Sequence, residues 1–466
     1  MTQKTLETAG SDIAKLAQPP SLVEAIQHHC NLEKASFHTP GHKGRWYEER
    51  LACEEFGLAK YDVTELPGLD DFTSPQGPIQ HLSERVAQLW GASGSFLSVN
   101  GASAAIVAAI MACAVSGKRV LLPRSCHRSA VHALVLSGMD PVWYDACWDD
   151  EWQVWSGIEA GSFARLLDEH GDRLACALVN SVDYSGSLTN ISDLAARCRK
   201  ANIPIIVDEA HGAHCLTGSA LSQGADFVVH SLHKTLGALT QTGVLHVGSN
   251  CKIQSDKVKA ALNLIHSSSP SYLLLSSVEQ AIHNFKSLAQ QIARTEFMAN
   301  ELRHWLSRQG ACVFQGRHGV DSFHLLFKFP EISGQELASA LIAKGVYPET
   351  VLGQGVLLLL GLGNNDGDVT GLQEAIDQIK AGSLMNPSRP QAHFTPRFGD
   401  QLLNPRQAWS TSSETIEITK ASGRIASDCV APCPPGTPVL CPGQRILDDI
   451  TTLLPEHRWL RVVAES

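Results

Sequence analysis

An aspartate and a lysine each follow a buried strand of the predicted sheet. Residues 203–214 (IPIIVDEAHGAH) place Asp208 at the end of an apolar run, and residues 225–236 (ADFVVHSLHKTL) place Lys234 just after the next one. Taken alone, Asp208 could cap the following turn or pair with a buried cation, and Lys234 could be a solvated residue whose stem covers the sheet edge. Open α/β sheets bind ligands at the carboxyl ends of their strands, so we expect both side chains to face one crevice.

A carboxylate and an amine at neighbouring strand ends are the pair that pyridoxal phosphate requires. The lysine amine forms a Schiff base with the cofactor aldehyde, and the carboxylate keeps the pyridine nitrogen protonated, so that the ring accepts electrons from the bond being broken. The phosphate needs a cradle as well. Residues 100–103 (NGAS) form a small-residue turn that opens a helical run, and the free N–H groups and positive dipole end suit an anion, although such turns also begin structural helices. Ser231 and His233 could add donors.

His127 and Lys43 each have an alternative role. His127 follows a predicted strand and begins a helix. Its imidazole could stack on a flat heteroaromatic ring or simply cap that helix. Lys43 follows a histidine, as Lys234 does, but it lies in a Gly/Pro loop at residues 40–44. We therefore assign the Schiff base to Lys234.

Short apolar runs alternate with helical stretches between residues 118 and 248. The runs are too continuously apolar to have a solvated face, which predicts strands covered by helices on both sides of a largely parallel sheet. Residues 190–201 predict one of these helices. The fold class is therefore α/β, with predicted strands at residues 119–122, 141–144, 174–180, 204–207, 227–230 and 244–247.

A long helical pattern follows from Ser277 to about Arg308, and the chain then changes character. Its apolar residues recur every three to five positions, at Val278, Ile282, Phe285, Leu288, Ile292 and Phe297. Beyond Gly310 the pattern predicts a smaller α+β unit with strands at 323–329 and 356–360 and helices at 335–344 and 369–381. Residues 383–413 predict a loop. We divide the chain into an N-terminal segment (1–60), a large α/β domain (61–308) and a C-terminal α+β domain (309–466).

The composition excludes several classes of protein. The chain has 466 residues, 44% of them hydrophobic, and its 37 basic and 47 acidic residues give a net charge of −10. The basic residues are scattered, so we expect no nucleic-acid partner. The longest apolar run, residues 104–115, is shorter than the roughly 20 residues that span a bilayer. Residues 1–18 lack a secretory apolar core, and we expect a cytoplasmic protein without a membrane partner.

The thirteen cysteines predict reduced thiols and no disulfide framework. Most lie inside apolar segments, as Cys113, Cys176 and Cys198 do. Cys429, Cys433 and Cys441 stand apart in a proline-rich tail, but a metal site there would need a fourth ligand and more regular spacing. We predict no metal.

Taken in order, the motifs resemble those of the prokaryotic ornithine/lysine/arginine decarboxylases of the aspartate-aminotransferase fold (fold type I). That resemblance implies a large domain with a mostly parallel seven-stranded sheet and a smaller α+β C-terminal domain. The resemblance covers residues 20–280, with weaker matches at 347–349 and 423–443, and the chain is similar to the short biosynthetic type. The motifs are TPGHKG (39–44), DVTE (62–65), GLDD (68–71), GPI (77–79), Asn100-Gly101, the His127 segment, DEAHGAH (208–214), SLHKTL (231–236) and SSPSY (268–272).

The resemblance implies a role for each matched residue. Lys234 corresponds to the Schiff-base lysine, Asp208 to the partner of the pyridine nitrogen, and His127 and Ala210 to the residues on the two ring faces. His211 belongs to the cofactor-binding set. The phosphate contacts are Gly101, Ala102, Ser103, Ser231 and His233, with Ser268 from a loop of a neighbouring subunit. Many relatives have a hydroxyl residue in place of Ala102, so backbone donors must suffice there.

The implied reaction is the decarboxylation of arginine, lysine or ornithine, with a slight preference for arginine, and its amine product would feed polyamine metabolism. The resemblance also implies a homodimer, or a dimer of dimers, with its active site at the subunit interface. We expect His233 or Lys234 to reprotonate the α-carbon. Glu349 would pair with the distal cation of the substrate; Glu65, Asp70 and Asp71 are alternatives that could equally cap turns. A transaminase, a cysteine desulfurase and a non-catalytic cofactor-binding regulator remain open.

Overall fold

The computed structural model describes residues 20–36, 38–43, 57–283, 285–382, 395–433 and 436–465. Parts of the predicted N-terminal segment (1–60) and of the predicted loop (383–413), and Gly44 of the TPGHKG motif, lie outside the described residues. No helix within these ranges is long and apolar enough to cross a membrane.

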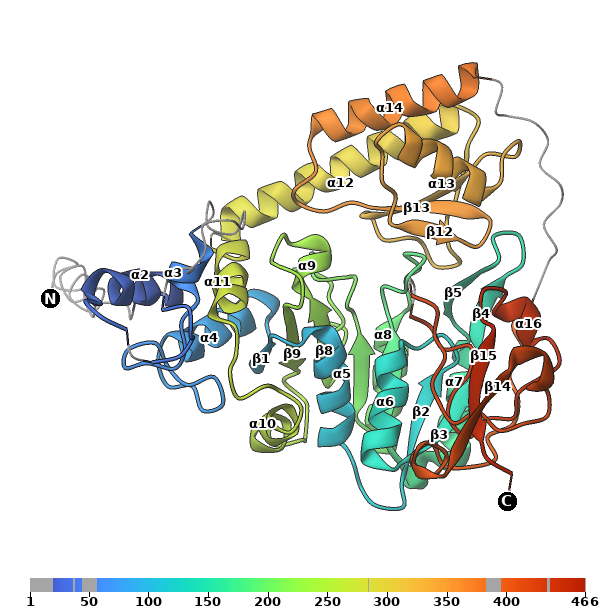
Figure 1. Ribbon diagram of the computed structural model, residues 1–466, viewed down its shortest axis with the longest axis horizontal. Helices are drawn as coiled ribbons and strands as arrows, with labels where there is room; N and C mark the ends of the chain where they lie inside the picture. The colour runs from blue at the N-terminus through green and yellow to red at the C-terminus, as the bar shows by residue number, and fades with distance from the viewer. Residues whose placement is uncertain are drawn as a thin grey trace, which may run out of the picture.

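A seven-stranded sheet forms the centre of the large domain (Figure 1). β9 runs antiparallel to both of its neighbours, and the other adjacent pairs are parallel. The predicted, mostly parallel sheet is therefore confirmed, with each predicted strand present to within one residue at either end. The strand that sequence analysis missed is the edge strand β1. In spatial order the strands are β1 (Gly94–Ser98), β9 (Gly243–Val247), β8 (Phe227–Ser231), β7 (Ile205–Asp208), β6 (Leu174–Asn180), β2 (Arg119–Pro123) and β3 (Asp140–Tyr144).

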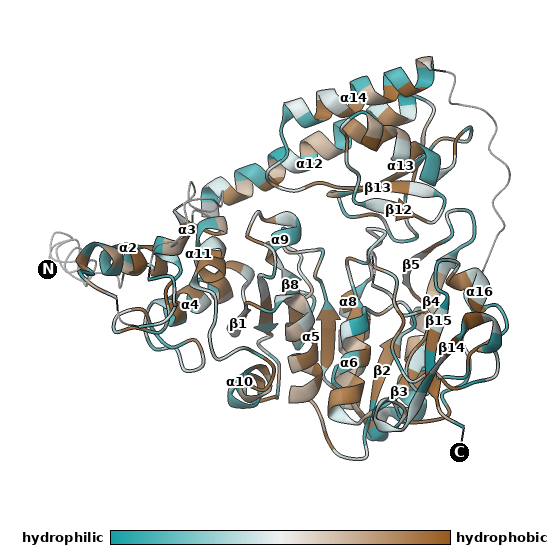
Figure 2. Ribbon diagram, in the orientation of Figure 1, coloured by the Kyte–Doolittle hydropathy of each residue, from teal (hydrophilic) through white to brown (hydrophobic). Residues whose placement is uncertain are grey.

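Helices cover both faces of this sheet, which explains its continuously apolar strands. Alternate residues of a strand face opposite sides: Val120 and Leu122 contribute to one core, whereas Leu121 contributes to another. The first core includes helices α5 (Gly101–Ala112), α6 (Arg128–Ser137) and α10 (Ser255–Asn263). The second includes α7 (Ala160–His170) and α8 (Ile191–Ala201), the latter as predicted. The central strands are correspondingly brown in Figure 2.

The helix predicted from Ser277 to Arg308 is wrong at its start. The structure has two helices, α11 (Tyr272–Ala281) and α12 (Phe285–Arg308). Ile282 ends the first with a φ of −111°. Because Val278, Ile282 and Leu288 all pack in one core, the apolar spacing continues across the break and conceals it. The remaining N-terminal helices are α2 (Leu22–Leu32), α3 (Leu58–Tyr61) and α4 (Pro78–Trp90).

The predicted smaller α+β unit contains a four-stranded antiparallel sheet in the order β10-β11-β13-β12. It lies beside α12, α13 and α14 (Figure 1). The short strands β10 and β12 were not predicted. The bounds are β10 (Cys312–Val313), β11 (His324–Lys328), β12 (Thr350–Leu352), β13 (Gly355–Leu359), α13 (Gly334–Ala343) and α14 (Asp366–Ala381).

The last part of the chain forms a further unit with its own small core. Figure 1 places it beside the β4–β5 hairpin of the large domain. The predicted loop is wrong at Pro405–Ser410, which form helix α15, because Asn404 and Gln407 build a capping box around Pro405. The domain boundaries at residues 60 and 308 stay predictions. The other elements are β4 (Ala146–Asp149), β5 (Val154–Ile158), α9 (Leu232–Thr235), β14 (Ser413–Glu417), β15 (Trp459–Val463), α16 (Ile450–Leu453) and the 3-10 turns Gly171–Arg173 and Ile418–Lys420.

Candidate active site

A cavity of about 400 Å³ opens at the carboxyl ends of β6, β7 and β8. Ser268 is the one residue of the predicted cofactor-binding set that does not line it. The predicted residues that line the cavity are Gly101, Ala102, Ser103, His127, Asp208, Ala210, His211, Ser231, His233, Lys234 and Glu349. The structure thus brings together residues that are up to 248 positions apart, while their individual roles stay predictions.

Asp208 is the last residue of β7 and has only 8% of its surface exposed. Its carboxylate accepts the N–H of Ala210 at 3.2 Å. Burial raises the pKa of Asp208 above its ordinary value, and the positive charge of Lys234 and the Ala210 hydrogen bond oppose that effect. The carboxylate therefore both caps its turn and lies near a cationic side chain. Sequence analysis had treated these two roles as alternatives, and the structure shows both.

Lys234 lies in α9, immediately after β8, and its amine points into the cavity and not to solvent. Nζ lies 2.8 Å from Nε2 of His211. Burial lowers the pKa of Lys234, against the opposing effects of Asp208, Glu349 and Cys433. A lysine with a lowered pKa is a better nucleophile at neutral pH, because more of it is the free amine.

The N-terminus of α5 borders the same cavity. Gly101 has a φ of +74° and donates its N–H to the carbonyl of Gln241 at 2.7 Å. Asn100, the N-cap, makes no side-chain hydrogen bond to the helix, so the first-turn N–H groups of Ala102 and Ser103 remain available to an anion. A Cβ at Gly243 would lie 2.6 Å from the nitrogen of Ala102, so the close approach of β9 to this turn requires glycine there.

His127 is the N-cap of α6. Its Nδ1 accepts the N–H of Ser129 at 3.2 Å, which confirms the capping alternative. Burial lowers the pKa of His127 to about 4, and the positive charges of Lys234 and Arg128 act in the same direction. The imidazole is therefore neutral at pH 7. Since the ring also lines the cavity, capping leaves it able to stack on a flat ligand.

Sequence analysis missed several residues of the cavity, among them Asn180, Tyr184 and Cys433. Asn180 ends β6 and could have been found by the rule that identified Asp208. Its Oδ1 is buried without a hydrogen-bond partner in the structure. Tyr184 donates its hydroxyl to Oε1 of Glu349 at 2.8 Å. Burial raises the pKa of Tyr184, and Glu349 adds to that shift, so the phenol keeps its proton.

The alternative acidic residues do not reach the cavity. Asp70 accepts four backbone N–H groups at the start of α4, and Asp71 accepts the N–H of Thr73 at 2.7 Å. Glu65 accepts the hydroxyl of Thr64 at 2.7 Å. Lys43 donates its amine to the carbonyl of His38. For Asp70 and Asp71 the turn-capping role is therefore confirmed.

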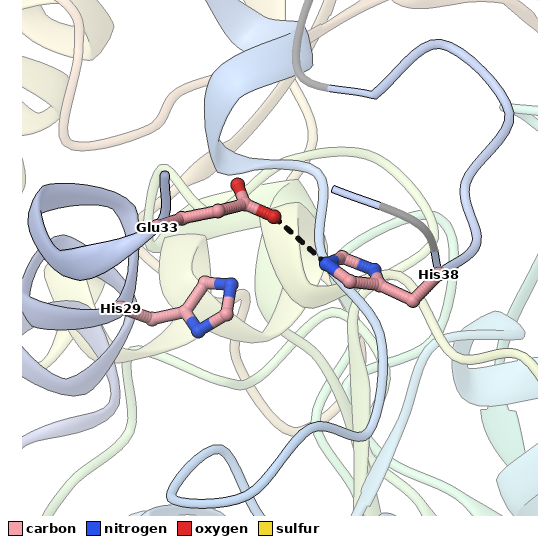
Figure 3. A group of neighbouring side chains, drawn as sticks. All are labelled: His29, Glu33 and His38. Carbon is pink, nitrogen blue, oxygen red and sulfur yellow. Dashed lines mark hydrogen bonds and ion pairs between the residues drawn. The ribbon is translucent and has the colours of Figure 1, made fainter. Parts of the chain in front are cut away.

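Two groups of described side chains have the spacing of metal ligands, and neither contains Cys429, Cys433 or Cys441. Figure 3 shows the first group, which contains His29 on α2, Glu33 just after that helix, and His38. Its one marked contact joins Glu33 Oε1 and His38 Nε2 at 2.9 Å, as in an ordinary ion pair, and it lies outside the cavity. The second group contains His214, Cys215 and Asp321. Cys113, Cys176 and Cys198 are buried free thiols, as predicted.

Comparison with known proteins adds independent information. Residues 19–319 match the family model described as the major domain of Orn/Lys/Arg decarboxylase, and residues 389–465 match its C-terminal domain. The chain is 31% identical to the uncharacterized Bacillus subtilis protein YaaO, with 91% of each chain covered. It is 29% identical to an arginine decarboxylase of the same organism, with 92% of this chain and 91% of the relative covered.

Solved structures agree on the fold. The constitutive lysine decarboxylase of Escherichia coli superposes with a TM-score of 0.80 at 20% identity, over 96% of this chain and 82% of that one. The predicted aspartate-aminotransferase-like fold is thereby confirmed.

Proposed function

This chain belongs to the Orn/Lys/Arg decarboxylase family, whose members are amino acid decarboxylases, and on that premise we propose that it decarboxylates arginine with pyridoxal phosphate as cofactor. The observation that carries the proposal is that Asp208, Lys234 and the N-terminus of α5 border one cavity. A buried carboxylate, an amine with a lowered pKa and an anion site are the three groups that this cofactor needs.

The residues of the cavity fit this cofactor. Lys234 would hold its aldehyde carbon, Asp208 its ring nitrogen, and His127 and Ala210 its two ring faces, with His211 beside Lys234. Oδ1 of Asn180 is buried without a hydrogen-bond partner and could accept a hydrogen bond from a group bound in the cavity. The phosphate would take the N–H groups of the α5 terminus and the hydroxyls of Ser103 and Ser231, with His233 beside Ser231. When bound, pyridoxal phosphate supplies the electron sink for the bond being broken.

Lys234 is the better of the two candidates for returning a proton to the α-carbon. Nδ1 of His233 lies 3.3 Å from the carbonyl of Thr242 and donates to it. Burial lowers the pKa of His233, so its ring is neutral and its other nitrogen holds no proton at pH 7. Lys234 has exchangeable protons in either charge state. We therefore assign the proton transfer to Lys234.

Glu349 is our proposed partner for the distal cation of the substrate. Tyr184 donates to one of its oxygens, which leaves the other oxygen for a cationic ligand. A guanidinium presents two N–H groups side by side, whereas an ammonium is a point charge. Two of the Bacillus relatives are named arginine decarboxylase, and this supports the preference for arginine over lysine.

Glu349→Gln is expected to raise KM for arginine about two- to fivefold, because the guanidinium loses its charged partner and Glu349 is exposed in the structure. kcat should change much less, since the reacting bond lies at the other end of the substrate. Tyr184→Phe is the matched control: it keeps the Glu349 charge and removes one hydrogen bond, so a smaller rise in KM is expected. Initial rates across a substrate panel of arginine, lysine and ornithine measure both. An unchanged KM in Glu349→Gln would rule out the pairing.

A cysteine desulfurase is the second candidate, because the structure brings Cys433 to the cavity on the proline-rich tail segment. A desulfurase needs such a cysteine to accept sulfur. Membership in the decarboxylase family favours the first candidate instead. Cys433→Ser should keep decarboxylation unchanged within about twofold, and the wild-type enzyme should release carbon dioxide from arginine but no sulfide from cysteine. Sulfide release that depends on Cys433 would reverse the order of the two candidates.

We also propose that the amine product feeds polyamine metabolism and that the enzyme acts in the cytoplasm as a homodimer. Support for the homodimer comes from Ser268, which the family resemblance places at the phosphate of a neighbouring subunit. In its own chain Ser268 does not line the cavity, as expected of a residue that acts across an interface.

A further inference from the structure

A chain of buried hydrogen bonds runs from Lys234 into the smaller α+β unit. Nε2 of His211 lies 2.8 Å from Nζ of Lys234, and Nδ1 of His211 lies 3.1 Å from Nε2 of His324. Nδ1 of His324 lies 2.7 Å from Oδ2 of Asp321. His211, His324 and Asp321 are exposed by 6%, 0% and 6% of their surface, so water does not compete for these contacts. Asp321 and His324 stand at the start of β11, outside the large domain.

The acid at the end of this hydrogen-bond chain sets the direction of its bonds when each ring carries a single proton. An ionised carboxylate only accepts, so Nδ1 of His324 carries a proton and donates to Asp321. A neutral imidazole then has a bare Nε2, which accepts the Nδ1 proton of His211. His211 is left with a bare Nε2, and this nitrogen faces the amine of Lys234.

Asp321 is held ionised and in place. Burial alone would raise its pKa, but the hydrogen bonds from His214 and His324 outweigh burial and lower the pKa of Asp321 below its usual range. Oδ1 accepts from Nε2 of His214 at 2.8 Å, and Oδ2 also accepts the N–H of Phe323 at 3.0 Å. From α12, Arg303 donates to the backbone carbonyls of residues 321 and 322.

We propose that Asp321 and His324 are positioning residues that fix the tautomer of His211, so that His211 presents a hydrogen-bond acceptor to the amine of Lys234. This inference rests on the proposed function only in taking Lys234 as the reacting amine. An acceptor at that point orients the amine and stabilises its protonated form. An N–H in the same place would repel the ammonium, which would lower the pKa of Lys234.

The first test reads the tautomers directly in the cofactor-free wild-type protein. Nitrogen-15 NMR of labelled histidine distinguishes protonated from bare ring nitrogens, and His211→Gln and His324→Phe assign the two signals by their disappearance. We expect both rings to be neutral and protonated on Nδ1. A bare Nδ1 or an imidazolium at either position would overturn the proposal. This measurement involves no turnover, so it stands apart from any failure of the proposed decarboxylation.

The second test follows the protonation of Lys234 itself. Cofactor-free protein is mixed with pyridoxal phosphate at a series of pH values, trapped with borohydride, and the label on Lys234 is quantified by mass spectrometry. His324→Phe and Asp321→Leu interrupt the series of hydrogen bonds and should shift the midpoint of labelling about one pH unit lower. The groups that also face Lys234 are unchanged in both variants: Asp208, Glu349, Cys433 and His127.

Asp321→Asn is the matched control. The Oδ1 atom of the new asparagine can still accept hydrogen bonds from Phe323 and His324, while its NH₂ group faces His214. Nδ1 of His214 is unpartnered in the structure, so that ring can change tautomer and accept from the NH₂ group. The variant thus removes the charge and keeps the direction of the hydrogen bonds from His211 to residue 321. Its labelling midpoint should therefore stay near that of the wild type. A shift as large as that of Asp321→Leu would mean that Asp321 acts only by its charge, and would overturn the proposal. Should a breaking variant fail to fold, His211→Gln still assigns the His211 signal, and the tautomer of that ring in the wild-type protein decides.

Discussion

Lys234→Ala is expected to lower kcat for the decarboxylation of arginine by on the order of 10³-fold or more, because the variant loses both the covalent attachment of the cofactor and the proposed proton donor. Release of carbon dioxide from labelled arginine measures the activity, and the visible absorbance of bound pyridoxal phosphate measures attachment. Both should be lost together. In the cofactor-free protein the melting temperature should not fall, because burial penalises the charged amine, as the lowered pKa of Lys234 shows.

Lys43→Ala provides the matched control for this prediction. Lys43 also follows a histidine, but its amine donates to the carbonyl of His38, outside the cavity. The variant should keep the visible absorbance of the cofactor. If Lys234→Ala kept that absorbance and Lys43→Ala lost it, the assignment of the covalent lysine would be wrong.

Asp208→Asn should reduce kcat by on the order of 10²–10³-fold, the loss that is typical when a preorganised charged group is removed from a reacting centre. The amide cannot hold a proton on the ring nitrogen by charge, so the electron sink weakens. Absorbance of the cofactor and a KM near that of the wild type would show that binding survives. A variant with unchanged kcat would contradict the role of Asp208.

Asp208→Asn should lower kcat but raise the stability of the folded protein, because the carboxylate that it replaces is buried. Burial raises the pKa of Asp208 in the folded, cofactor-free protein, so the folded state binds more protons than the unfolded state. The contribution of Asp208 to stability is therefore greatest below the unfolded pKa of about 4 and falls as the pH rises toward the folded pKa. Asp208→Asn removes that fall. Relative to the wild type, its free energy of unfolding in urea should increase between pH 4 and pH 7, and a decrease would contradict the burial of an ionised carboxylate.

The fold was predictable where a single physical pattern dominates. β6 is buried along its whole length, so its apolar run has the same bounds in the sequence and in the structure. The edge strand β1 alternates buried and partly exposed residues and contains Gly94 and two serines, which weakens the signal. The break between α11 and α12 was hidden because the apolar spacing is continuous across it.

The site was predictable where strand ends determine it. Asp208 and Lys234 follow two strands that are adjacent in both the sequence and the sheet, so their meeting could be foreseen. Tyr184 and Glu349 meet across 165 positions, and His211 and His324 across 113. Those contacts join the large domain to the smaller α+β unit. Local sequence patterns do not predict how two such units pack against each other, so these contacts could not be foreseen.

The central claim is that Lys234 carries the cofactor beside Asp208, and the most direct measurement is to reduce the purified holoenzyme with borohydride, digest it and locate the label by mass spectrometry. The account predicts that a pyridoxyl phosphate group is found on the peptide that contains Lys234. A label on another lysine, or a protein that takes up no label at any pH, would contradict it.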